Sequence, residues 1–232
     1  RERRLYPSFT EEQVTAFIQS LGEDVPGGLA SRELEYHHLK KSLKAWARSR
    51  GPHALAYYSA EWRVSDAIKR CWRRETGSQL NIRRSKDEIR WVDLPPLKAD
   101  FSHVQEVALS GLTWKGHSSS LFLENFTHIK SLSMTGAELV ELPAVIGDMK
   151  QLTSLKLPSN ELKLSERSAA SLSALDALQV LDLSENPLGT LPDFGGMPHL
   201  RALNLSFTRI ERWPSGLRTQ TGLERVDLRH NR

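Results

Sequence analysis

The chain has one cysteine, and its surroundings are those in which a thiol can become a nucleophile. Cys71 lies in the run KRCWRR. The flanking cations Arg70, Arg73 and Arg74 could favour the thiolate form. No histidine or acid is spaced to act as its base, however. The other interpretation is a small apolar residue on the buried face of a helix, and we favour it because that base is lacking.

Other residue types that perform chemistry show no pattern typical of a catalytic or metal site. Among the eight histidines, His37 and His38 follow Glu33, but this is not the HExxH spacing with which a helix binds zinc. We expect both to be solvated helix residues. The sequence contains no GxSxG elbow, no P-loop and no GxGxxG fingerprint. We therefore predict no catalytic residue, metal or cofactor in this segment.

Positive charge gathers in the first part of the chain. Residues 1–100 carry 19 Lys+Arg and 14 Asp+Glu, whereas residues 101–232 carry 13 and 14. A basic cluster in the first part could contact phosphates or acidic lipid, although such a run is more often a solvated helix face. Its members are Lys69, Arg70, Arg73, Arg74, Arg83 and Arg84. We expect Trp62, Trp72 and Trp91 to fill a core rather than to stack on bases, and we expect no nucleic acid.

A motif of the form LxxLxLxxNxL recurs six times after residue 100, at steps of 22 to 26 residues. Leucine-rich repeats have periods of about 20–29 residues. Residues 101–232 are therefore predicted to form an α/β leucine-rich-repeat solenoid of about six repeats, with parallel strands on its concave face and the last repeat truncated. The six segments start at Val104, Ile129, Leu152, Leu178, Leu200 and Leu223.

Within each repeat the fourth and sixth positions are apolar, so they share one face of a short strand and point into the core. The ninth position is expected to carry an asparagine whose amide bonds the backbone of adjacent turns. Asn160, Asn186 and Asn231 fit this pattern. Leu112, Ala137 and Thr208 depart from it. We expect irregular spacing at those three turns.

The segments that return to the next strand have their own signals. Pro143, Pro192 and Pro214 each follow an apolar residue, which suits a convex loop or the start of a short helix. The third repeat is longer. There Ser165 is a candidate N-cap, and apolar residues at helical spacing predict a convex α-helix over residues 166–177.

Residues 1–78 are predicted to form a small antiparallel helical bundle that acts as the amino-terminal cap of the solenoid. The helices are expected near residues 8–22, 29–49 and 53–75, the first with a capping box between Thr10 and Gln13. Residues 79–100 follow as a capping strand and linker. Their strand-like runs are LNIR and IRWVDL, and Pro95-Pro96 ends them.

The concave sheet face is the large surface that remains as a candidate for binding a partner. Alternation along the strands turns the third, fifth and seventh positions of each repeat outward. These positions are small and polar in the first repeats and charged in the last, where aromatic residues adjoin them. Since hot spots favour aromatic and arginine side chains, we predict partner binding on the carboxy-terminal half of this face. The candidate residues are Asp182, Asn204, Phe207, Asp227, Arg229 and His230.

The lead-in to the repeats carries a more specific pattern. It consists of LYPSFTEEQVTAFIQSLG, ELEYHHLKKSLKAWA, AIKRCWRRETG and ADFSHVQEVALSGL. These runs resemble the leucine-rich-repeat effectors of pseudomonads and related bacteria. Those proteins carry an NEL-type ubiquitin-protein ligase domain and often a dermonecrotic-toxin-like amino-terminal region. The family's catalytic cysteine lies in a CxD motif after the repeats. Cys71 is followed by Trp72-Arg73, so it does not match and receives no such role.

The resemblance implies a substrate-recognition region, secreted by a bacterium and acting in the host cytoplasm. Its partner would be a host protein, and a ligase domain beyond Arg232 would recruit the ubiquitin-conjugating enzyme. We expect the chain to be a piece of a longer protein, monomeric, with no membrane span because its apolar runs are short. Two other functions stay open. The solenoid could shield or regulate a neighbouring toxin domain, or the basic region could bind phosphate or membrane.

Overall fold

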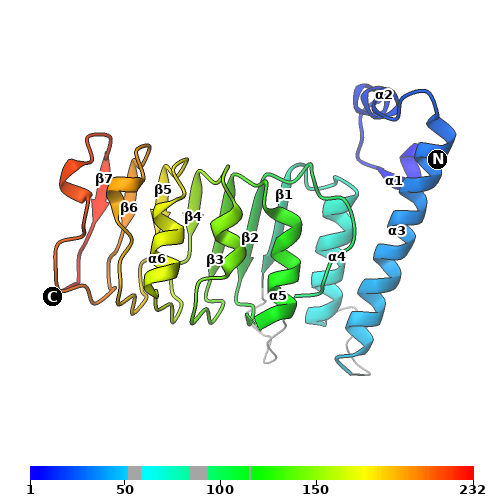
Figure 1. Ribbon diagram of the computed structural model, residues 1–232. Coiled ribbons are helices and arrows are strands. Elements are labelled where there is room, and N and C mark those ends of the chain that lie inside the picture. Colours follow the sequence, from blue (N-terminus) through cyan, green and yellow to red (C-terminus); the bar gives the residue numbers. More distant parts are fainter. Residues whose placement is uncertain (52–58, 84–93, 115) are drawn as a thin grey trace.

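The computed structural model describes residues 1–51, 59–83, 94–114 and 116–232 (Figure 1). In this part of the chain, one parallel sheet holds seven strands in chain order. This arrangement confirms the predicted leucine-rich-repeat solenoid, in which each repeat packs only against its neighbours. The strands are β1 (Gln79–Arg83), β2 (Glu106–Ser110), β3 (Ser131–Thr135), β4 (Ser154–Lys156), β5 (Val180–Asp182), β6 (Ala202–Asn204) and β7 (Arg225–Asp227).

The register of the strands stacks the apolar positions of successive repeats. Leu132 stands opposite Leu155, which stands opposite Leu181, and the next partner is Leu203. All four side chains are at most 2% exposed. Burying one leucine contributes about 1.5–3 kcal/mol. The repeated step therefore extends one continuous core along the length of the solenoid.

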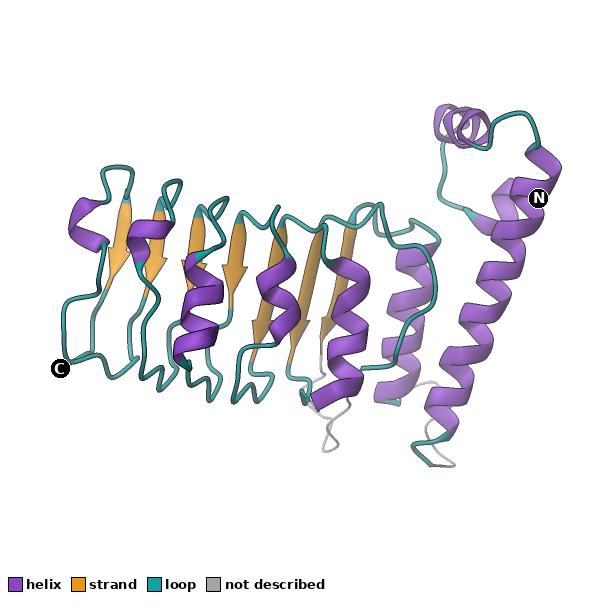
Figure 2. Ribbon diagram, viewed as in Figure 1, coloured by secondary structure: helices purple, strands orange, loops and turns teal. Residues whose placement is uncertain are grey.

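The return segments form the second layer, on the opposite side of the core from the concave sheet face (Figures 1 and 2). A short 3₁₀ helix follows each of the prolines that were expected to start one, and Pro143 is itself the N-cap residue of its helix. The sequence did not predict α5. The elements of this layer are α5 (Gly116–Leu123), η1 (Glu124–Phe126), η2 (Ala144–Asp148), α6 (Glu166–Ser173), η3 (Phe194–Gly196) and η4 (Leu217–Thr219).

The helix predicted over residues 166–177 is present but shorter. Ser165 caps α6 as expected, with its hydroxyl accepting from the Ser168 N–H at 3.2 Å. The chain then leaves the helix through two tight turns, in which the N–H groups of Leu175 and Leu178 each donate to the carbonyl three residues before. These turns bring both leucines into the core, where they are at most 1% exposed.

The asparagine ladder is confirmed. The Asn186 amide nitrogen donates to the carbonyls of Leu157, Leu183 and Ser184 at 2.8 to 3.0 Å. Its amide oxygen accepts from the Leu162 N–H at 3.0 Å. One buried side chain thus provides hydrogen-bond partners for backbone N–H and C=O groups of two consecutive turns. Without it these groups would be buried and unpaired.

The turns that lack asparagine are more regular than expected. Asn160 reaches back and accepts from the Ala137 N–H at 2.8 Å, and Asn231 does the same for the Thr208 N–H at 3.0 Å. The strand register continues past both turns without a shift. The prediction of irregular spacing was wrong at Ala137 and Thr208, because the asparagine of the following repeat bonds each turn. The turn at Leu112 has no such amide, because the next repeat carries Ala137, and there the Trp114 N–H donates to the Ala137 carbonyl at 3.0 Å.

The described residues of the front end form four helices, and their arrangement differs from the predicted bundle. The capping box of Thr10 and Gln13 is confirmed. However, α3 is longer than predicted and packs side by side with α4, while α2 lies across the amino-terminal end of α3 rather than alongside it (Figure 1). The helices are α1 (Glu2–Leu5), α2 (Glu11–Ser20), α3 (Val25–Arg48) and α4 (Ala60–Trp72).

The expected capping strand is β1, and it pairs with β2 in register with the repeats. Helix α4 packs against β1 and so covers the first turn of the solenoid. The second strand-like run, residues 89–94, lies mostly outside the described residues, as do Arg84 and Trp91.

A carboxylate ties the helices to the solenoid. Glu35 on α3 accepts from the Trp72 indole N–H at 2.9 Å and from the backbone N–H of Asp100. Arg32 bridges Glu35 and Asp100 at 2.9 Å to each. Partial burial raises the pKa of Asp100, but hydrogen bonds from Ser102 and Arg32 outweigh it and hold this pKa at about 2. The network fixes the cap onto the first repeats.

We expect Asn186→Ala to lower the free energy of unfolding by about 2–4 kcal/mol, since it leaves several buried backbone groups without partners. Guanidinium denaturation would measure the loss. Asn204→Ala is the matched control on the concave face, with an expected loss of about 1 kcal/mol or less. If both variants lost the same free energy of unfolding, the asparagine ladder would not be the main polar interaction that stabilises the core.

Candidate functional site

The sheet register brings the predicted polar candidates into one row. Asp182 on β5 stands opposite Asn204 on β6, which stands opposite Asp227 on β7. Lys156 on β4 precedes Asp182 in the same row. All four occupy the fifth position of their repeats, so their side chains share the concave face.

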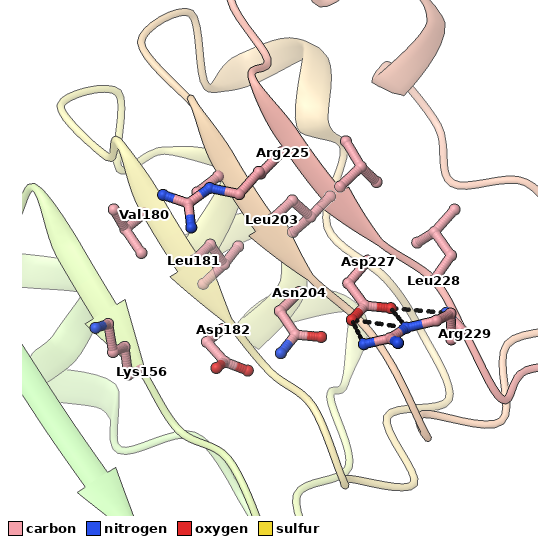
Figure 3. A pocket seen from close by; sticks show the side chains of 12 residues that line it. Lys156, Val180, Leu181, Asp182, Leu203, Asn204, Arg225, Asp227, Leu228 and Arg229 are labelled. Atoms are coloured by element: carbon pink, nitrogen blue, oxygen red, sulfur yellow. Dashed lines mark hydrogen bonds and ion pairs between the residues drawn. The ribbon is translucent and has the colours of Figure 1, made fainter.

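This row crosses a groove of about 660 Å³ in the carboxy-terminal half of the concave face (Figure 3). Two other rows flank it. The third-position row supplies Val180, Ala202 and Arg225, and the seventh-position row supplies Arg229. The groove therefore combines an apolar strip with polar and charged side chains, a mixture found in sites that bind ligands or peptides.

Within the groove, Asp227 and Arg229 form a closed pair. The Arg229 guanidinium donates to both carboxylate oxygens of Asp227, at 3.0 Å from Nε and at 2.7 Å from Nη2. These hydrogen bonds hold the pKa of Asp227 at about 2 and raise the pKa of Arg229. The geometry is the two-point contact that arginine makes with carboxylates.

Asp182 and Asn204 use one oxygen each to shape their own turn. The Asp182 Oδ1 accepts from the N–H and hydroxyl of Ser184 at 3.0 and 2.6 Å. The Asn204 Oδ1 accepts from the same two groups of Ser206 at 3.0 and 2.8 Å. These hydrogen bonds fix the orientation of both side chains. The Oδ2 of Asp182 and the Nδ2 of Asn204 take no part in them. Both residues are half-buried.

Phe207 and His230 meet just beyond the strands. Their rings stack with centroids 4.1 Å apart and planes inclined by 15°. Both follow the seventh position of their repeats and both have a left-handed backbone, with φ of 56° and 59°. Phe207 is 52% exposed. A bulky residue in this conformation is uncommon and costs about 1–2 kcal/mol.

The left-handed eighth position is a feature of every repeat, and the sequence analysis missed it. Gly111 and Gly136 occupy it in the first two repeats, and these glycines were the available signal. The backbone N–H at this position donates to the next repeat, as from Phe207 to the Arg229 carbonyl at 3.1 Å. The residues at this position are Gly111, Gly136, Ser159, Glu185, Phe207 and His230.

The six predicted site residues therefore form two neighbouring groups. Four line the groove, and the Phe207–His230 pair lies at the end of the strands. The structure adds Lys156 and Arg225 to the groove, although neither was among the candidates. Both are outward positions of the repeat pattern, so alternation alone could have found them.

The basic region of the helices is engaged within the protein. Arg70 and Arg73 both pair with Glu75, at 3.3 and 3.1 Å. The Arg74 guanidinium lies 5.9 Å from the ring centres of Tyr6 and Phe9. These contacts favour the structural interpretation of the basic run over phosphate binding.

Two of the predicted core assignments hold, whereas Trp62 is only partly buried. Trp72 is 2% exposed and stacks on Tyr36 at 4.9 Å. Cys71 is fully buried, and burial raises the pKa of its thiol to about 12. A thiol in that state is a poor nucleophile at neutral pH. Cys71 therefore belongs to the apolar face of α4.

The described residues contain no group of three or more His, Cys, Asp or Glu placed to hold a metal ion. None of the described helices combines the length and the apolar character that a membrane crossing needs.

Residues 150–210 match the family model described as leucine rich repeat. An uncharacterized leucine-rich repeat-containing protein of Schizosaccharomyces pombe is 32% identical over 129 residues, which cover 56% of this chain and 20% of that protein. A probable disease resistance protein of Arabidopsis thaliana is 37% identical over 92 residues, 39% of this chain and 10% of its own length. The chain thus spans a fifth or less of these curated relatives.

Among solved structures, the leucine-rich-repeat ectodomain of the receptor kinase SOBIR1 from Arabidopsis thaliana is similar to this chain. It aligns with a TM-score of 0.44 and 24% identity, over 53% of this chain and 67% of its own.

We expect Cys71 to resist a thiol reagent such as 5,5′-dithiobis(2-nitrobenzoate) at pH 8, because its thiol is buried and its pKa lies near 12. One equivalent should react once guanidinium unfolds the protein. Absorbance of the released thiolate measures both states. Rapid reaction of the folded protein would show that the thiol is accessible and reopen the nucleophile hypothesis.

We expect Phe207→Gly to change the free energy of unfolding by no more than about 1 kcal/mol, because the relief of left-handed strain offsets the lost stacking on His230. Leu205→Ala, two residues earlier and fully buried, should cost about 2–5 kcal/mol. Denaturant midpoints would measure both. A loss of 3 kcal/mol or more in Phe207→Gly would mean that the ring supports the fold.

Proposed function

We propose that this chain is a protein-recognition module whose partner binds the carboxy-terminal half of the concave face. The observation that carries this proposal is the joint presence, on the last four strands β4 to β7, of an ordered polar groove and an exposed aromatic pair. A leucine-rich-repeat solenoid presents such a face as a rigid, continuous binding surface.

The aromatic pair argues for a role outside the fold. Phe207 keeps an exposed ring on a backbone conformation that glycine would adopt at less cost. Folding alone gives no reason for this choice, whereas exposed aromatic side chains next to arginine are typical of binding hot spots. Arg229 lies beside the pair, since its carbonyl accepts the Phe207 N–H.

The chemistry of the groove suits binding rather than catalysis. The carboxylate of Asp227 is neutralised by Arg229, and Asp182 is held by Ser184. Ser184 donates its hydroxyl to Asp182 within the same turn, and the described residues that line the groove include no histidine or cysteine. Shape and fixed hydrogen-bonding groups are therefore the properties that this surface offers.

We also propose a narrower role, which rests on the resemblance of the helical lead-in. In this proposal the module belongs to a bacterial effector that is secreted, acts in the host cytoplasm and delivers a host protein to an NEL-type ligase domain elsewhere in the parent protein. Cys71 would take no part, because it is buried and has a raised pKa. A charged conjugating enzyme should then form no ubiquitin thioester on this chain. Thioester formation at Cys71 would contradict the assignment.

A photocrosslinking experiment tests the recognition role. A benzoyl-phenylalanine placed at Phe207 should crosslink a discrete protein from a eukaryotic cell lysate, because this position lies beside the proposed contact surface. The crosslink should disappear when Asp182→Ala and Arg229→Ala are combined in the same chain. Gel mobility followed by mass spectrometry would measure both results.

The matched control carries the same crosslinker at Arg167, an exposed residue of α6 on the convex side. It should give no discrete product. If both positions give the same products, or if the groove substitutions leave the Phe207 product unchanged, the concave face is not the binding surface.

A further inference from the structure

The groove keeps a positive charge that its own acids do not neutralise. Five charged residues line it, and two of them, Asp227 and Arg229, form a closed ion pair at 2.7 Å. In the part of the chain that the structure describes, Lys156, Asp182 and Arg225 have no ion-pair partner. Two cations and one carboxylate leave the groove with one net positive charge, so it attracts acidic rather than basic ligands.

The two cations lie on opposite sides of the groove and have different surroundings (Figure 3). Lys156 is on β4, next to Asp182 in the same row. Arg225 is on β7, in a row with Ala202 and Val180, and its guanidinium extends over that apolar strip. The positive charge of an arginine above apolar side chains has no polar group beside it to offset it. Its guanidinium presents a planar fork that fits a carboxylate.

We infer that the partner enters this groove as an extended peptide segment whose acidic side chain pairs with Arg225 and whose apolar or aromatic side chain packs on Phe207. This inference rests on the proposed recognition function and specifies the class of ligand. Asn204 provides an amide donor and Asp182 a carboxylate acceptor between these two anchors, matching the C=O and N–H groups of a peptide backbone.

The spacing of the two anchors limits the sequence of the ligand. Arg225 occupies the third position of its repeat and Phe207 the eighth of the preceding one, so they are five positions apart in the repeat. At about 3.3 Å per residue this is at most roughly 16 Å, because the chain leaves the strand after Asn204 and turns at Ser206 and Phe207. An extended peptide lying along β6 and β7 covers that distance in about five residues or fewer. The preferred ligand therefore has its acid and its apolar side chain within about five positions of each other.

A peptide-display selection tests this inference. Random twelve-residue peptides would be selected on the whole 232-residue chain and, separately, on the variants Arg225→Gln, Lys156→Gln and Phe207→Gly. The wild-type pool should be enriched in peptides with Asp or Glu within about five positions of an aromatic residue. The acid should be lost from the Arg225→Gln pool and the aromatic residue from the Phe207→Gly pool.

Lys156→Gln is the matched control, because it removes the same charge from the same groove without touching the anchor. Its pool should keep the acidic position. A peptide from the wild-type pool, measured by fluorescence anisotropy, should bind Arg225→Gln at least about tenfold more weakly, as expected for one lost charged hydrogen-bond pair. Binding to Lys156→Gln should fall less.

The possible results separate this inference from the proposed function. A pool that depends on Phe207 but shows no acidic preference overturns the carboxylate anchor and leaves the recognition surface in place. Equal losses for the two charge variants overturn Arg225 as the anchor, since general attraction then explains the preference. A pool rich in Lys and Arg overturns the inference as well. Selections that enrich no peptide on any form contradict both proposals.

Discussion

The parallel register between neighbouring strands is the constraint on which the rest of the structure depends. Because Leu155 stands opposite Leu132 and Leu181, the apolar positions of each repeat are buried by those before and after it. A shift of one residue would turn every leucine to solvent and every polar side chain to the core. The asparagine ladder is a second interaction that fixes the register, since Asn186 bonds backbone groups of the preceding repeat only when consecutive turns are aligned. The binding face is a consequence of the same alignment.

The cap and the solenoid form one structure through two kinds of contact. Strand β1 continues the sheet at its amino-terminal edge, and α4 covers the core beneath it. The carboxylate of Glu35 then joins α3, α4 and the backbone at Asp100. The aromatic side chains of Tyr36 and Trp72 stack beside this carboxylate. The arginines around Cys71 make their own contacts within the cap, Arg70 and Arg73 with Glu75 and Arg74 with aromatic rings.

The sequence predicts the features that local periodicity controls, and it misses those that depend on neighbouring turns. Spacing alone predicted the strands, the ladder asparagines, the capping box at Thr10 and the N-cap at Ser165, because each is set by residues a few positions apart. It did not predict that the turn at Ala137, which has no asparagine of its own, would stay regular through its bond to Asn160. The position of α2 across α3 also depends on tertiary packing that periodicity does not encode.

The same distinction applies to the site. Alternation placed Asp182, Asn204 and Asp227 on one face, but it could not show that Arg229 closes on Asp227 while Arg225 stays unpaired. Nor could it show that Phe207 and His230 would stack, because their meeting requires the left-handed turn that both repeats share. That turn was encoded by Gly111 and Gly136, which look like ordinary loop glycines until the repeats are aligned. In a periodic fold, a repeat whose side chains depart from the pattern of the other repeats is thus a candidate for a role outside the fold.

The eighth position shows how such a departure arises. Its backbone conformation is required in every repeat, since its N–H group links one turn to the next. Glycine meets this requirement with the least strain, and the first two repeats use it. The later repeats carry side chains at the same position, and there the left-handed Phe207 and the unpaired Arg225 lie on neighbouring repeats, at opposite ends of the strands. Strain and unpaired charge therefore coincide on the same two repeats, where the fold requires neither.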